Sequence, residues 1–159
     1  MKNVWFWIFM VLTIAWMTVI FMFSAKDADT STVTSYKVGR TIGRLFVPGF
    51  EQMPEDEQTA FAARIDKPVR KTAHACEYAV LGFLAMGTFI GYDTERYYKS
   101  RKTLFLISAA LCILYAVSDE VHQYFVPGRA CRFMDMCIDS AGVLVGTFAC
   151  TVLKRVLKK

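Results

Sequence analysis

The sequence predicts an all-α membrane protein in which four transmembrane helices form a bundle, and three observations support this fold class. The chain of 159 residues is 55% hydrophobic and only 21% charged, whereas soluble globular domains are roughly 45–50% apolar. Its mean hydropathy is +0.33. The apolar residues also gather into long stretches, and a bilayer requires about 20 such residues in one helix. We therefore expect a single membrane domain over residues 1–159 rather than a soluble bundle of buried helices.

The four expected spans are the four long apolar stretches. The first carries no charged residue and is too long for the apolar core of a signal peptide, so we expect it to remain in the protein. In each of the other three, charged residues occur only towards one end. The expected spans cover residues 4–23, 72–92, 103–125 and 133–153.

The connection between the first two spans, residues 24–71, is expected to contain short amphipathic helices. Apolar residues recur at helical spacing over residues 31–46, which predicts the first of these helices. Acidic residues directly after Pro54 predict a second helix that runs to about Ile65, after which Pro68 opens the second span. The pattern leaves open whether these helices cap a site at the membrane surface or lie on the lipid headgroups.

The net charge of +5 is unevenly distributed along the chain. Lys and Arg are concentrated in the short connection 93–102 and in the tail 154–159, and basic segments of this kind mark the cytoplasmic side. We therefore expect both termini in the cytoplasm and the loop 24–71 outside it. Because the basic residues alternate with spans, they suit the anionic headgroups of membrane lipids, and we expect no nucleic-acid partner.

The charged and histidine side chains of the expected spans, together with Ser24 and Gln123, fall at the outer ends of those spans. Ionisable side chains within spans are costly and usually face the bundle interior, which makes them candidates for function. By contrast, we interpret the pair Gly142 and Gly146 as a surface for close helix packing. The sequence therefore predicts an outward-facing polar site, whose candidates are Ser24, Arg70, Lys71, His74, Glu77, Asp119, Glu120, His122, Gln123, Asp135 and Asp139.

Three kinds of chemistry would suit these groups, and the sequence leaves the choice open, including whether the protein is an enzyme. A His beside a carboxylate can serve as a general base. Metal binding is a second reading, with a weak signal, because the Glu-x-x-His pattern of bundle metal sites occurs here once and reversed. In the third reading, the acids pair with nearby Arg and Lys and fasten the helix ends. The candidate catalytic residues are His74, Glu77, Asp119, Glu120, His122 and Asp139, and the candidate metal ligands are His74, Glu77, Glu120 and His122.

Arg129 and Arg132 follow a Pro-Gly turn at the expected outer headgroup level. Guanidinium groups there could hold a phosphate in bidentate fashion, or they could simply extend towards lipid headgroups. No cofactor is indicated by the sequence. The candidate ligand-binding residues are Ser24, Arg70, Lys71, Gln123, Arg129, Arg132 and Asp135.

The motifs in this order resemble the VanZ-like family of integral membrane proteins. Residues 70–78 resemble its R-K-x-x-H-x-x-E-Y segment, residues 118–129 its S-D-E-x-H-Q-x-F-V-P-G-R block and residues 135–142 its D-x-x-x-D-x-x-G block. Ser24 lies where the family has an F-S-S-Q-like end to its first span, although Ala-Lys follows here. The resemblance implies a multi-pass protein of the bacterial cytoplasmic membrane with a role in the cell envelope. The namesake of the family is an accessory protein associated with resistance to the glycopeptide teicoplanin.

Three functions therefore compete at this point. In the first, the outward site binds or modifies a lipid-linked or peptidoglycan-related component or a glycopeptide. In the second, the protein is a non-catalytic accessory or structural protein whose charged cluster fastens the bundle. Ion or proton transport is a weaker third, because the inner half of the second span, residues 81–92, is almost wholly apolar.

Overall fold

The computed structural model describes residues 2–92 and 94–157, with the backbone only for residues 2, 3 and 94–99. Within these residues helices are the only regular secondary structure and no strand is present, which confirms the predicted fold class. The elements are, in chain order, α1 Lys2–Ser24, α2 Ala28–Phe46, η1 Phe50–Gln52 (a short 3-10 helix), α3 Glu55–Tyr92, α4 Thr94–Gln123 and α5 Phe133–Val156.

Four helices are long and apolar enough to cross a membrane, namely α1 from Val4, α3, α4 from Ser100, and α5. They match the predicted spans to within one helical turn, except at the start of the second. Ser100 has non-helical backbone angles (φ −132°, ψ 34°), so the third span begins there. Asp93 of the predicted cytoplasmic connection lies outside the described residues, as do Lys158 and Lys159 of the tail.

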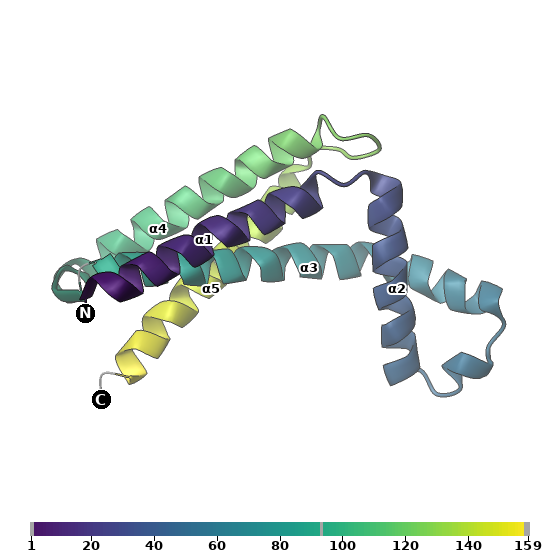
Figure 1. Ribbon diagram of the computed structural model, residues 1–159. Coiled ribbons are helices and arrows are strands. Elements are labelled where there is room, and N and C mark those ends of the chain that lie inside the picture. The colour runs from purple at the N-terminus through teal and green to yellow at the C-terminus, as the bar shows by residue number, and fades with distance from the viewer. Residues whose placement is uncertain (1, 93, 158–159) are drawn as a thin grey trace.

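Helix α3 is the centre of the bundle, because it contacts α1, α2, α4 and α5. Figure 1 shows α1 and α4 running along the bundle, α5 crossing α3 at an angle, and α2 lying across the direction of the spans. The buried core between the spans includes Ile20, Tyr78, Ala116 and Val143, which come from α1, α3, α4 and α5. Many other large apolar side chains of the spans are exposed, as expected where helices face lipid tails.

Two glycines allow α5 to approach α3 closely. A Cβ atom at Gly142 would collide with the carbonyl oxygen of Ala75, and one at Gly146 would collide with that of Ala79. The contacts are with backbone atoms, which cannot rotate away as a side chain can. The structure therefore confirms the interpretation of this pair as a surface for close helix packing.

The predicted boundary between the second loop helix and the second span was wrong. The structure has one continuous helix, α3, with Pro68 inside it. A proline in a helix interior removes one hydrogen bond and usually kinks or ends the helix. Here the segment before Pro68 is held in place by α2, where Gly39 packs on Ala62 and the Ser35 hydroxyl donates to Asp66. Tertiary contacts therefore outweigh the local preference for a break.

Helix α2 confirms the predicted amphipathic helix and begins three residues earlier than expected. Asp27 caps it, because its carboxylate accepts a hydrogen bond of 2.7 Å from the backbone N–H of Thr30. The same bond lowers the pKa of the Asp27 carboxyl from its usual range. Ser35, Gly39 and Gly43 form the buried face of the helix, which fixes how α2 lies against α3 and η1.

Candidate functional site

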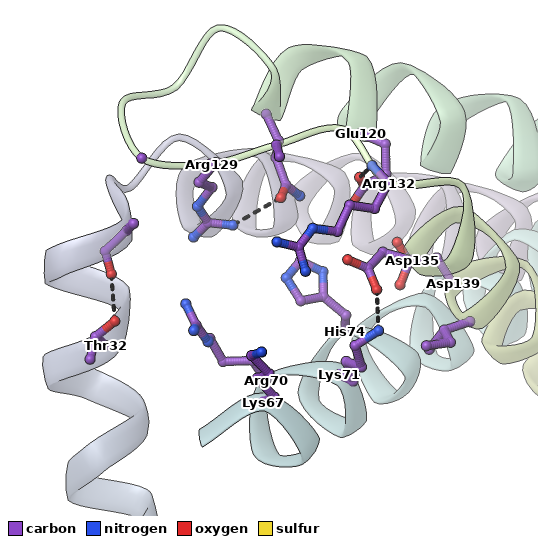
Figure 2. A pocket seen from close by; sticks show the side chains of 15 residues that line it. Thr32, Lys67, Arg70, Lys71, His74, Glu120, Arg129, Arg132, Asp135 and Asp139 are labelled. Atoms are coloured by element: carbon purple, nitrogen blue, oxygen red, sulfur yellow. Dashed lines mark hydrogen bonds and ion pairs between the residues drawn. The ribbon is translucent and has the colours of Figure 1, made fainter. Parts of the chain in front are cut away.

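A cavity of about 220 Å³ lies where the first part of α3, the end of α4 and the start of α5 meet (Figure 2). Helix α2 and the loop between α4 and α5 complete its wall. Most of the residues that the sequence predicted for the site line this cavity. They are Arg70, Lys71, His74, Glu120, Gln123, Arg129, Arg132, Asp135 and Asp139.

Five cationic side chains surround the cavity. Lys67, Arg70 and Lys71 lie at helical spacing on one face of α3, and Arg129 and Arg132 come from the loop after α4. Two of these five side chains have a carboxylate partner. The Arg70 Nη2 atom lies 2.5 Å from Asp66, and the Lys71 Nζ atom lies 2.5 Å from Asp135. Among the described residues, Lys67, Arg129 and Arg132 form no ion pair.

Arg129 holds the loop against α1, α2 and α4. Its guanidinium donates to the Gln123 side-chain oxygen at 3.1 Å, to the Ser31 hydroxyl at 2.5 Å and to the Phe23 carbonyl at 3.4 Å. Burial lowers the pKa of Arg129 from its usual range, and the nearby Arg70 adds to this effect. Gly128 precedes it with φ +74°, a conformation that strongly favours glycine and that turns the loop back over the cavity.

Two of the carboxylates at the cavity, Glu120 and Asp139, are deeply buried. Glu120 is 2% exposed and accepts a hydrogen bond of 3.1 Å from the backbone N–H of Arg132. Asp139 is 1% exposed, and neither of its carboxylate oxygens has a hydrogen-bond partner among the described residues. Buried polar groups are nearly always hydrogen-bonded, so an exception requires a specific explanation.

The imidazole of His74 lies in the middle of the cavity, between Arg132 and the face of α3 (Figure 2). Its Nδ1 atom is buried without a hydrogen-bond partner in the described part of the chain. A ring in this position would contact any molecule that filled the cavity.

The remaining predicted site residues lie beside the cavity rather than on its wall. Ser24 and Asp119 share a donor, because the Gln123 side-chain nitrogen lies 2.8 Å from the Ser24 hydroxyl and 3.3 Å from Asp119. His122 stacks on Phe21 of α1, with ring centroids 4.8 Å apart. Glu77 is outside the cavity lining, and its backbone carbonyl accepts a hydrogen bond from Trp16.

The predicted metal ligands do not come together. Among the described residues, no three His, Cys, Asp or Glu side chains are grouped as a metal site would require. Of the four candidates, only His74 and Glu120 line the cavity. The geometry therefore gives no support to the metal-binding reading.

Sequence reasoning missed Lys67, Thr32 and Ala28, which also line the cavity. Lys67 lies three, four and seven residues before Arg70, Lys71 and His74, so a continuous helix would have placed all four on one face. The prediction of a break at Pro68 hid this signal. Thr32 and Ala28 carry no local signal, because they reach the cavity only through the docking of α2 on α3.

The arrangement suits the binding of a small anion, because cationic donors outnumber their carboxylate partners around this cavity. The comparisons agree with the sequence motifs: the family model described as VanZ/LLP1 matches residues 9–154. No curated protein and no solved structure matches the chain. Because this family model matches nearly the whole length of the chain, the protein belongs to the VanZ/LLP1 family, with four helices of membrane-spanning length.

Proposed function

We propose that this protein binds the phosphate-bearing headgroup of a lipid or lipid-linked envelope component at the outer face of the bacterial cytoplasmic membrane. The observation that carries this proposal is the set of cations around one cavity, of which Lys67, Arg129 and Arg132 lack an ion-pair partner among the described residues. A phosphate would supply the missing negative charge. Arginine is especially suited to phosphate, because its planar donors match two phosphate oxygens.

The depth of the cavity supports a headgroup as the ligand. Its wall is made by Glu120 and Gln123 at the end of one span and by Asp135 and Asp139 near the start of the next. In a bilayer these span ends would lie at the edge of the hydrocarbon layer, next to the lipid phosphates. Binding of an envelope lipid or lipid-linked intermediate at this place would connect the family's envelope context, including resistance to teicoplanin, with the chemistry of the cavity.

A second candidate function is structural, and one specific contact favours it. Lys71 of α3 and Asp135 of α5 form an ion pair, with 2.5 Å between Nζ and Oδ1. Such a pair holds the two helices together, as expected if the charged cluster stabilises the bundle. Under that reading the protein is a non-catalytic accessory. Both functions are compatible with this single pair, so the unpaired cations are the better test.

Replacing Arg132 by Gln is expected to weaken phosphate binding at least about tenfold, because one charged hydrogen-bonding group contributes about 1.5–3 kcal/mol. Binding of glycerol 3-phosphate to the full chain in maltoside detergent, followed by ³¹P NMR, measures this. The matched control is Lys37→Gln, which removes an exposed charge of α2 outside the cavity. Since the Arg132 guanidinium has no described partner, the melting temperature should stay unchanged. A lowered melting temperature with unchanged binding would favour the structural function instead.

The outward orientation of the cavity can be tested with a native cysteine. Cys131 is exposed and lies in the loop that borders the cavity, between Ala130 and Arg132. We expect a membrane-impermeant maleimide to label Cys131 in cells whose cytoplasmic membrane is intact and whose outer membrane or cell wall has been removed. Cys131→Ser identifies the labelled residue, because it should abolish that labelling. Labelling that requires permeabilised cells would place the cavity on the cytoplasmic side.

A further inference from the structure

Apart from Lys71, which lies beside Asp135, the charged side chains at the two sides of the cavity are grouped by sign (Figure 2). In Figure 2, Lys67, Arg70 and Arg129 lie on the side of the cavity that faces α2. Glu120, Asp135 and Asp139 lie on the opposite side, which is formed by the end of α4 and the start of α5. Arg132 and His74 lie between the two groups. The cavity therefore presents a positive wall and a negative wall across a short distance.

Ion pairs within the protein neutralise only part of each wall. On the negative wall, Asp135 pairs with Lys71. Glu120 and Asp139 form no ion pair with another described residue. No ion pair with another described residue is formed by Lys67, Arg129 or Arg132 either. Each wall therefore keeps charged groups that are free to bind a ligand of opposite charge.

Asp139 is the most informative of these groups. It is 1% exposed, it borders the cavity, and both of its oxygens lack a hydrogen-bond partner in the described part of the chain. A phosphate at the positive wall would leave this carboxylate unsatisfied. An ammonium group would satisfy it, because it has three donors and the opposite charge. A hydroxyl has one donor and no charge, so it would satisfy the negative wall less well.

We propose that the ligand of this cavity is zwitterionic, with a phosphate bound by Arg129, Arg132 and Lys67 and an ammonium group bound by Asp139 and Glu120. Phosphoethanolamine is the simplest group with this pattern, and it occurs as a phospholipid headgroup or as a substituent on a glycan. The cavity of about 220 Å³ suits such a small group, since sites for drug-sized ligands measure about 300–1,000 Å³. This proposal rests on the proposed function, because it requires the phosphate site.

The experiment compares O-phosphoethanolamine with ethyl phosphate, which lacks the ammonium group, by calorimetry on the full chain in maltoside detergent. We expect O-phosphoethanolamine to bind about tenfold more tightly or better. Asp139→Asn should bring the affinities for the two ligands together, whereas Arg132→Gln should weaken both ligands and keep the ratio between their affinities. Glu120→Gln is a second variant, since its amide oxygen can still accept from the Arg132 backbone, and it should reduce the preference as well.

The outcomes separate the two proposals. Equal binding of both ligands by the wild-type protein would overturn the ammonium site and leave the phosphate site standing. Binding of neither ligand would overturn the proposed function and the zwitterionic ligand with it. Once the preference is established, competition by phosphatidylethanolamine, and not by phosphatidylglycerol, would identify the phospholipid as the source. A preference without lipid competition would identify the substituted glycan.

Discussion

Replacing Gly146 by Leu is expected to destabilise the protein by about 3 kcal/mol, at the upper end of the effects of overpacking. The reason is that α5 touches α3 through this position, and a Cβ there would already collide with the carbonyl oxygen of Ala79. No side-chain rotation can relieve a collision between a Cβ and a backbone carbonyl, so the two helices would have to separate. The melting temperature of the purified protein in detergent measures the effect.

Ala149→Leu is the matched control, because Ala149 is an exposed small residue on the same helix. The substitution adds a large side chain on a face of α5 that does not contact α3. We therefore expect the melting temperature to change little. If both variants melted alike, the close approach of α5 to α3 at Gly146 would not contribute to stability.

Asp139→Asn is expected to raise the melting temperature of the ligand-free protein. The substitution keeps the shape of the side chain and removes a buried carboxylate for which no hydrogen-bond donor is found among the described residues. The amide would also lack a partner, but an unpaired buried charge costs more than the roughly 1–3 kcal/mol of an unsatisfied neutral group, so removing the charge is expected to stabilise the protein by about 1 kcal/mol or more. Such a residue would exchange stability for function, as binding sites often do.

The control for this prediction is Asp119→Asn, because Asp119 is equally buried but accepts a hydrogen bond from Gln123. That variant should gain less stability or lose some. A drop in melting temperature for Asp139→Asn would show that the carboxylate supports the fold. In that case the charged cluster would act mainly to fasten the bundle.

Much of the candidate site could be predicted from local spacing. Arg70, Lys71 and His74 lie close together on one helix, and the structure places all three on the same cavity wall. Glu120 and Asp139 were also predicted, because the charged ends of their spans fall at one level. His122 was predicted with them but stacks on Phe21, because it lies two residues after Glu120, about 200° round the helix, and faces α1. Spacing therefore predicted where along the spans the site lies better than it predicted which residues line the site.

Local sequence is enough to predict which segments are helices of membrane-spanning length, because apolar length and periodicity are properties of consecutive residues. It also determined that the polar side chains meet at one end of the bundle. Long-range contacts are needed to explain why α3 continues through Pro68 and why α2 completes the cavity wall. They also explain why Lys71 and Asp135 are paired, while Arg132 and Asp139 form no ion pair among the described residues. The physical reason is that these features depend on contacts between residues far apart in the chain, whose energies outweigh the local preferences that a sequence displays.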